Sequence, residues 1–115
     1  MSISADTLRG YTDTIILTQF ISKDSYGYEI NKNVLQRTTG KYEFKEATLY
    51  TAFKRLEQSG LISSYWGEDG PGARRRYYRI TDEGRAYWQE RSREWLETRT
   101  LLNALLTLEA EHESN

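Results

Sequence analysis

The sequence predicts an α+β fold, mostly α, in which helices precede and follow one pair of strands. Apolar residues recur at helical spacing in three segments before residue 60 and again after residue 81. Between these segments, two runs rich in aromatic and β-branched residues flank the turn-forming stretch 67–72. The chain has 115 residues, a length that suits one compact domain.

Two helices are predicted in the first third of the chain. The first covers about 6–21 and has a wide apolar face, and the second covers about 26–37 with an apolar residue at every fourth position. Asp24 and Ser25 precede the second helix, and both side chains can accept hydrogen bonds from free backbone N–H groups. Gly40 suits the left-handed conformation that ends a helix.

A third helix is predicted over about 46–59, with Leu49, Phe53 and Leu56 on its inner face and Gly60 at its end. Its outer face carries short, hydroxyl-bearing or basic side chains: Ala47, Tyr50, Thr51, Lys54, Arg55 and Gln58. Short side chains let a helix approach the floor of a DNA groove, and basic ones reach phosphates. For this helix alone, a solvated amphipathic face is the plainer interpretation.

A β-hairpin is predicted from the runs 61–66 and 76–80, the second of which places Tyr78 and Ile80 on one face. The alternation over 42–44 also predicts a very short strand.

Thr81 is suited to cap a last helix that runs to about Glu109. This order of elements is the winged helix-turn-helix arrangement followed by a long C-terminal helix. We assign 1–81 to the winged helix-turn-helix part, including the N-terminal helix, and 82–115 to a C-terminal dimerisation helix; together they form one compact domain. The hydrophobic fraction of 37% is low for a small monomer, so a partner chain is expected to complete part of the core.

The charges are unevenly distributed, although the net charge is only −1. The segment 74–79 holds four Arg and no acidic residue, whereas 86–115 holds three Arg and six Glu. Attraction to phosphate acts over about 8 Å, so a local basic patch matters more for DNA than the total charge. Arg74, Arg75 and Arg76 are adjacent and repel one another, which favours a use on a phosphate backbone or in a minor groove over a merely solubilising hairpin.

Enzyme chemistry is not predicted. The chain has no Cys, a single histidine near its end (His112) and no Gly-rich phosphate loop, so no cofactor or metal site is expected. No run of eighteen apolar residues and no signal peptide is visible, so we expect a cytoplasmic protein without membrane contact.

Four segments resemble the PadR family of bacterial transcriptional regulators: YGYEI at 26–30, ATLYTAFKRLE at 47–57, GLI at 60–62 and RRYYRIT at 75–81. The resemblance extends over about 8–107. The short C-terminal part is similar to the compact branch with a single C-terminal helix, and to its multidrug-responsive members.

The resemblance implies a homodimeric repressor that is joined through its first and last helices and relieved by a small molecule. Two-fold symmetry then predicts an inverted-repeat operator in double-stranded DNA. Carried over by position, the implied DNA contacts are Thr48, Tyr50, Thr51, Lys54 and Arg55 in the third helix and Arg74, Arg75 and Arg76 in the hairpin. The pair Lys45-Glu46 departs from the family pattern, because no Ser, Asn or Asp caps the third helix.

Trp88, Trp95 and Leu102 recur every seven residues along the last helix, a spacing that suits a partner helix. With Leu8 and Ile15 from the first helix, they form the predicted dimer interface. The other apolar residues of the last helix are expected to pack on the first helix or on its symmetry mate: Tyr87, Leu96, Leu101, Leu105 and Leu108.

Trp95 has two interpretations, an anchor of the interface or the wall of a cavity between subunits. The resemblance implies the second, because multidrug-responsive members stack planar drugs on a Trp near this point. The candidate ligand-binding residues are Asp13, Leu17, Arg91, Trp95, Thr98 and Arg99. Arg91 and Arg99 favour anionic or neutral planar aromatic compounds unless Asp13 or Glu94 neutralises them.

An alternative from a different functional class is a winged-helix protein-interaction module without specific DNA binding. The net negative charge permits it, and the clustered arginines argue against it.

Overall fold

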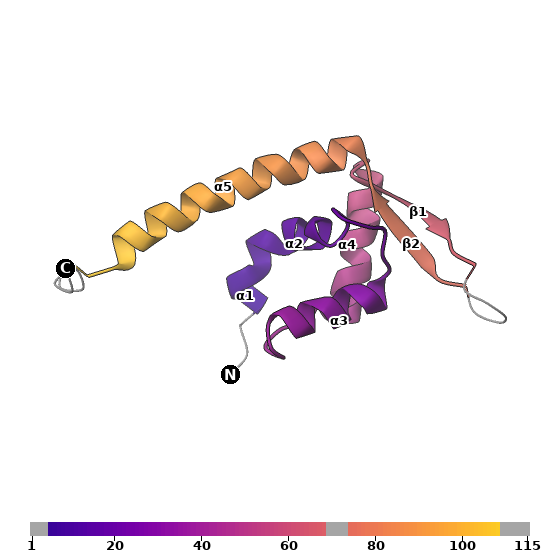
Figure 1. The fold of residues 1–115 in the computed structure, drawn as a ribbon, viewed down its shortest axis with the longest axis horizontal. Helices are drawn as coiled ribbons and strands as arrows, with labels where there is room; N and C mark the ends of the chain where they lie inside the picture. Colours follow the sequence, from indigo (N-terminus) through magenta and orange to yellow (C-terminus); the bar gives the residue numbers. More distant parts are fainter. Residues whose placement is uncertain (1–4, 69–73, 109–115) are drawn as a thin grey trace.

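The computed structural model describes residues 5–68 and 74–108. It confirms the predicted mostly helical α+β fold of winged helix-turn-helix type with a long C-terminal helix (Figure 1). The elements in chain order are α1 (Ala5–Leu8), η1 (Arg9–Tyr11, a 3₁₀ helix), α2 (Thr12–Thr18), α3 (Gly27–Arg37), α4 (Glu46–Gln58), β1 (Ile62–Trp66), β2 (Arg76–Ile80) and α5 (Asp82–Leu106).

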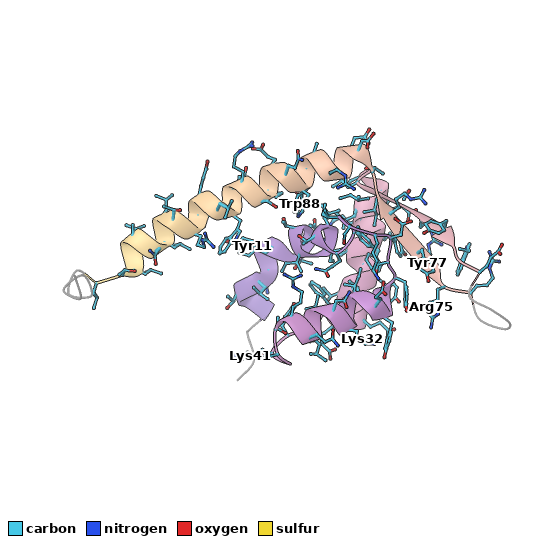
Figure 2. All side chains as sticks on the ribbon, viewed as in Figure 1. Tyr11, Lys32, Lys41, Arg75, Tyr77 and Trp88 are labelled. Carbon is cyan, nitrogen blue, oxygen red and sulfur yellow. The ribbon has the colours of Figure 1, made fainter. Side chains whose placement is uncertain are left out.

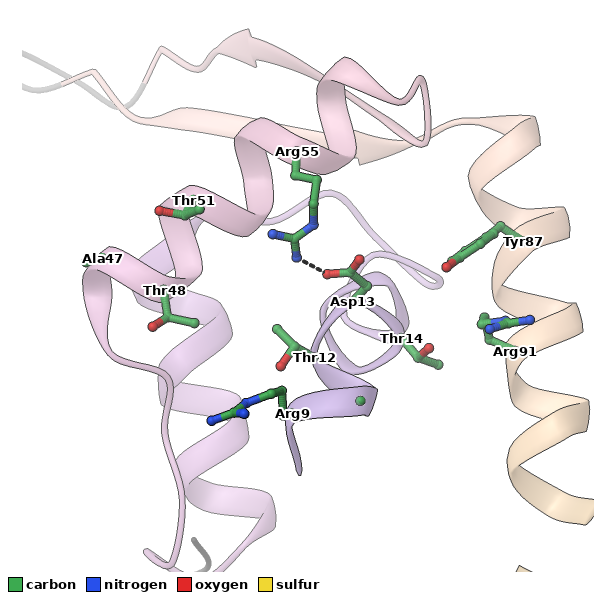
Figure 3. Close-up of a pocket in the computed structure, with 11 residues that line it drawn as sticks. Arg9, Thr12, Asp13, Thr14, Ala47, Thr48, Thr51, Arg55, Tyr87 and Arg91 are labelled. Carbon is green, nitrogen blue, oxygen red and sulfur yellow. Dashed lines mark hydrogen bonds and ion pairs between the residues drawn. The ribbon is translucent and has the colours of Figure 1, made fainter. Parts of the chain in front are cut away.

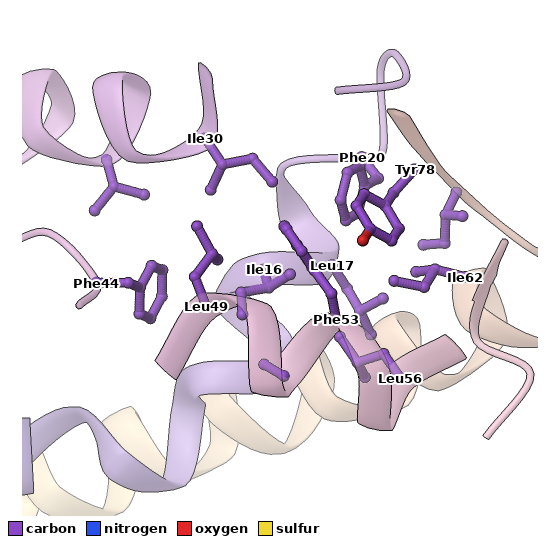
Figure 4. Packing of buried hydrophobic residues seen from close by; sticks show 13 residues of the cluster. Ile16, Leu17, Phe20, Ile30, Phe44, Leu49, Phe53, Leu56, Ile62 and Tyr78 are labelled. Carbon is purple, nitrogen blue, oxygen red and sulfur yellow. The ribbon is translucent and has the colours of Figure 1, made fainter. Parts of the chain in front are cut away.

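The core lies where α2, α3, α4 and the hairpin meet (Figure 4). Its aromatic centre is Phe53 of α4, which stacks on Tyr78 of β2 with ring centroids 4.2 Å apart. Phe20 contacts both rings at 6.1 and 6.3 Å. Burial raises the pKa of the Tyr78 hydroxyl above its usual value. The helix faces predicted to be apolar are therefore the ones that pack together.

The first helix is not continuous, which corrects the prediction of one helix over 6–21. The 3₁₀ turn η1, which contains Gly10, interrupts it. Glycine weakens a helix interior because, without a side chain, it loses more conformational freedom on folding than other residues. The α-helix then ends at Thr18, and Phe20 and Ile21 follow in a tight turn whose N–H groups bond three residues back. This turn directs Phe20 into the core.

Asp24 and Ser25 do not cap α3, contrary to the prediction. The residue before α3 is Tyr26, and no side chain caps the helix. Ser25 instead donates from Oγ to Glu29 Oε1 at 2.6 Å, and its backbone forms an isolated bridge with Tyr78 of β2. The Ser25 hydrogen bond holds the pKa of Glu29 below its usual range. The segment before α3 thus serves to join the helices to the hairpin.

Residues 42–44 form no strand, which corrects a second prediction. The amide side chain of Asn31 takes the place of a neighbouring strand: its Nδ2 donates to the Phe44 carbonyl at 2.9 Å, and its Oδ1 accepts from the Phe44 N–H at 2.8 Å. The aromatic side chain of Phe44 is buried by this contact. The alternating apolar residues Tyr42 and Phe44 therefore reflect packing of these side chains in and against the core, and not pairing of their backbone with another strand.

The hairpin is antiparallel and pairs Ile62 with Ile80 and Trp66 with Arg76. Tyr78 and Ile80 are buried on the same face, as predicted. Most of the predicted turn, residues 69–73, lies outside the described residues.

Helix α5 begins as predicted, because Thr81 Oγ1 accepts a hydrogen bond from the Gly84 N–H at 2.9 Å. It ends at Leu106, and the predicted end at Glu109 lies outside the described residues. Along α5, which is fully described, Gly84 alone is buried. The C-terminal end of α5 projects beyond the other elements (Figure 1).

The projecting α5 makes the radius of gyration 17.2 Å, compared with about 13 Å for a compact domain of this length. Within residues 5–68 and 74–108, no helix combines the length and the apolar character needed to cross a membrane.

Candidate nucleic-acid interface

Helix α4 has one buried side and one exposed side, in the arrangement that its sequence predicts. Leu49, Ala52, Phe53 and Leu56 are buried in the core. The exposed side carries most of the predicted DNA contacts: Thr48, Tyr50, Thr51, Lys54 and Arg55. No side chain caps the helix at Lys45, as expected from its sequence. The first turn therefore presents small side chains and backbone N–H groups that no capping side chain covers.

Tyr50 lies against the start of α3. Its ring meets Phe53 edge-on with centroids 5.5 Å apart, while 46% of the residue stays exposed. A Cβ atom on Gly27 would come within 2.6 Å of the Tyr50 hydroxyl. The absence of a side chain at Gly27 therefore allows the Tyr50 ring to lie against α3. Tyr50 thus has a packing role in addition to its exposed, outward-facing part.

Arg55 forms an ion pair with Asp13 of α2. Asp13 and Glu94 are the two carboxylates that the sequence indicates as possible partners of Arg91 and Arg99. Of these, Glu94 pairs with Arg91 one turn along α5, at 2.7 Å. Arg55 is half exposed. The pair thus joins the first helical segment to the outer side of α4.

Arg74, Arg75 and Arg76 are exposed, and each lies over an aromatic ring; Figure 2 labels Arg75. Arg74 lies 5.3 Å from the Trp66 ring centroid, and Arg75 lies 4.8 Å from the ring of Tyr26 at the start of α3. Arg76 donates to Ser64 Oγ at 2.8 Å. Such cation–π contacts reduce the conformational freedom of the guanidinium groups while leaving them accessible.

A second row of contacts on the outer face of the hairpin was missed from the sequence. The rings of Tyr65 and Tyr77 stack with centroids 5.7 Å apart. Asp24 accepts from the Tyr65 hydroxyl at 2.6 Å and from Arg79 Nε at 3.2 Å, and the first of these bonds raises the pKa of Tyr65. The alternation of the hairpin could have indicated which residues share this face, but not that Asp24 reaches them.

A groove of about 510 Å³ lies between the first helical segments and α5. The described residues that line it are mostly apolar, and none of them is charged: Thr7, Leu8, Tyr11, Thr14, Ile15, Thr18, Ser92, Trp95 and Leu102. Trp95 is 40% exposed and meets the Tyr11 ring edge-on with centroids 5.5 Å apart. The groove brings together four of the residues predicted for the dimer interface.

The fifth predicted interface residue, Trp88, packs against the core of its own chain and donates from Nε1 to Thr18 Oγ1 at 2.8 Å. Figure 2 shows Trp88 and Tyr11 on facing elements. Trp88 therefore fixes α5 to α2 within one chain. The sevenfold pattern therefore included one residue that packs within its own chain, Trp88, and two that line the groove, Trp95 and Leu102.

The predicted ligand-binding residues are not gathered at one place. Leu17 is fully buried in the core and lines neither the groove nor the surface, so it is removed from the candidate site. Asp13 is held by Arg55, and Thr98 and Arg99 lie farther along α5 and do not line the groove. Trp95 alone of the six lines it.

The remaining apolar residues of α5 do not pack on the first helix of their own chain. Leu101, Leu105 and Leu106 are 62%, 77% and 76% exposed. Tyr87, Leu96 and Leu108 are exposed as well. Packing on a symmetry mate, the other expected location, stays a prediction.

Comparison with known proteins identifies the fold's relatives. Residues 16–90 match the model of the transcriptional regulator PadR-like family. A transcriptional regulator from Clostridium thermocellum is 50% identical, with a TM-score of 0.83 over 91% of this chain and 99% of that one. A PadR family regulator from Clostridium difficile is 39% identical, with a TM-score of 0.75 over 84% of this chain and 99% of that one.

The fold is also that of Bacillus subtilis PadR, whose structure in complex with operator DNA is 21% identical with a TM-score of 0.63 over 74% of this chain and 46% of that one. The family match covers more than half of the chain and includes α3, α4 and the hairpin. Its members are transcriptional regulators and not enzymes. This chain belongs to the PadR-like family of transcriptional regulators.

Proposed function

We propose that this chain is a homodimeric, sequence-specific DNA-binding regulator that acts as a repressor. The observation that carries the proposal is the exposed side of α4. Ala47, Thr48 and Thr51 are short and exposed at its N-terminal end, with Lys54 one turn further on. In helix-turn-helix proteins the N-terminal residues of the recognition helix contact base edges, and basic residues beside them contact phosphates.

The hairpin supplies the second part of the DNA contact. Arg74, Arg75 and Arg76 are exposed at the start of β2 and on the residues before it. Guanidinium groups clustered at the end of a wing can bind the phosphate backbone or enter a minor groove. Bacillus subtilis PadR, which has the same fold, is bound to operator DNA in its structure, and this chain belongs to a family of transcriptional regulators; both support DNA as the partner proposed here.

A second copy of the chain is the proposed occupant of the exposed apolar side of α5. Leu101, Leu105 and Leu106 near its C-terminal end are more than half exposed, and the groove beside Trp95 continues that apolar surface towards the first helix. Contiguous apolar surface of this kind marks an interface, because its burial is favourable at about 25 cal/mol per Å². The lean apolar composition of the chain agrees with a core shared between protomers.

Sequencing the genomic DNA that the purified protein retains tests this function. We expect an inverted repeat whose half-site centres lie about one helical turn, roughly 34 Å, or a multiple of it apart. Light scattering should give twice the chain mass of 13.5 kDa. No enrichment, together with no binding to random duplex at low salt, would instead favour the protein-interaction module. Reporter expression that rises when the gene is deleted would support repression.

The groove beside Trp95 is the proposed effector site, and the uncharged side chains among its described lining residues favour neutral planar aromatic compounds. The expectation that cationic compounds bind less well than anionic or neutral ones is weakened by the Arg91–Glu94 pair, which neutralises one of the two arginines. A planar ring can stack on Trp95 in place of the Tyr11 edge. The effector would then lie where the second copy approaches.

Tryptophan quenching by the matched pair 1-pyrenesulfonate and 1-pyrenemethylammonium tests the effector site. Because the groove lining is uncharged, we expect the two probes to bind with affinities within about threefold of each other. A stacked pair contributes about 0.5–1.5 kcal/mol, so Trp95→Ala should lower affinity by about tenfold when both protomers are affected. Trp66→Phe, on the hairpin, is the control. Equal binding by wild type and Trp95→Ala would leave Trp95 as an interface anchor.

A further inference from the structure

The Asp13–Arg55 ion pair connects two elements that belong to different parts of the proposed function. Asp13 lies in the first turn of α2, and Arg55 lies on the outer side of α4, among the proposed DNA contacts (Figure 3). The side chains are 31% and 50% exposed, so the pair is accessible to a competing anion from solvent. Arg55 therefore has a bound carboxylate before any DNA is present.

The position of Asp13 is set by buried neighbours on both sides. Ile16 and Leu17, one turn further along α2, are fully buried in the core. Tyr11, which precedes α2, packs on Trp95 of α5. Asp13 is thus held on a fixed part of the molecule, whereas Arg55 has a long side chain that can reach in more than one direction.

The surroundings of the pair are basic and open. A cavity of about 580 Å³ lies between the first helical segments, α4 and α5. Of the described residues that line it, Asp13 alone is acidic, while Arg9, Arg55 and Arg91 are basic. Thr48 and Thr51, on the proposed base-reading side of α4, line the same cavity. A DNA phosphate near α4 would enter a surface on which Asp13 is the competing anion.

We propose that Asp13 is a positioning residue for Arg55: it occupies the guanidinium in the free protein and releases it to a DNA phosphate on binding. The inference rests on the proposed DNA-binding function. Carboxylate and phosphate both form charge-assisted hydrogen bonds with a guanidinium group. To contact a phosphate, Arg55 must therefore give up its contact with Asp13. As a result, the affinity for DNA is lower than the exposed positive charge of α4 alone would give.

Removing the Asp13 carboxylate should raise the affinity for DNA, and this gain should depend on Arg55 alone. An exposed ion pair of this kind is weak, so Asp13→Asn should raise affinity for the pulled-down operator and for random duplex by about two- to fivefold per protomer. Because Arg55 contacts the phosphate in the bound state of both proteins, the slope of log K against log salt should change little in Asp13→Asn, whereas Arg55→Gln should make it shallower by about 0.9 per protomer.

Fluorescence anisotropy across a salt series, with Asp13→Asn, Arg55→Gln and the double variant, tests the inference. The gain from Asp13→Asn should vanish when Arg55 is replaced, because the carboxylate acts through that side chain. Asp13→Glu should keep wild-type affinity, since the anion is retained. Glu90→Gln removes the carboxylate of another ion pair, that with Arg93, which does not line the cavity, and serves as the matched control with little change expected.

An equal gain in the presence and absence of Arg55 would show a general charge effect and overturn the inference. Unchanged affinity in Asp13→Asn would overturn it as well, while leaving DNA binding intact. No DNA binding by the wild type would instead refute the proposed function itself. Thermal melting verifies that each variant is folded, and Asp13→Ser provides a second neutral variant if Asp13→Asn does not fold.

Discussion

Replacing Gly84 with alanine is expected to lower the free energy of unfolding by about 2–3 kcal/mol, because the new methyl group overpacks a rigid contact. A Cβ atom at position 84 would lie 2.0 Å from the Leu61 carbonyl oxygen and 2.8 Å from Ile80 Cγ1. The first of these atoms belongs to the backbone at the start of the hairpin and cannot turn aside. Alanine favours a helix over glycine by about 1 kcal/mol, which offsets only part of this cost.

Urea unfolding measures the change, and Gly10→Ala is the matched control. A Cβ atom on Gly10 would have no atom within 4 Å, so that variant should stay within about 0.5 kcal/mol of the wild type. If Gly84→Ala were as stable as the control, α5 would not lie against the hairpin as closely as the structure places it.

Replacing Arg75 and Arg76 together with alanine should weaken binding to all duplexes by a similar factor, on the order of tenfold to a hundredfold at low salt. If each arginine of a dimer contacts one phosphate, the slope of log K against log salt should become shallower by up to about 3.6. Thr51→Ala should instead change sequence preference more than overall affinity, because that side chain faces the proposed base-reading side of α4.

Anisotropy titrations with the operator and with random duplex separate these effects. Arg79→Ala is the matched control, because Arg79 lies on the same strand and is paired with Asp24 at 3.2 Å and stacked on Tyr65. It should retain most of the wild-type affinity and salt slope. A double variant of Arg75 and Arg76 with wild-type slope would show that the hairpin does not contact the phosphate backbone.

The residues around the groove beside Trp95 show what the sevenfold sequence pattern could and could not predict. The sevenfold spacing of Trp88, Trp95 and Leu102 correctly indicated one side of a helix, because side-chain direction follows from helical geometry. It could not indicate that Trp88 bonds to Thr18 of its own chain, whereas Trp95 remains 40% exposed. The sequence pattern marks the apolar side of the whole helix. Only the tertiary structure shows which part of that side packs against the helix's own domain.

By itself, the sequence determined the order of the elements and the inner side of α4, because both follow from local periodicity. It also determined where α4 stops and α5 starts. Gly60 takes the left-handed conformation with φ of 77°, and Thr81 accepts the capping bond from the Gly84 N–H. These features depend on residues within a few positions of one another, so they can be derived before any tertiary contact is known.

Only the tertiary structure decided which charged and polar side chains meet. Arg55 pairs with Asp13 across 42 positions of sequence, and Asn31 replaces a strand beside Phe44 across 13. Contacts of this range depend on how the helices cross, and no local pattern encodes that arrangement.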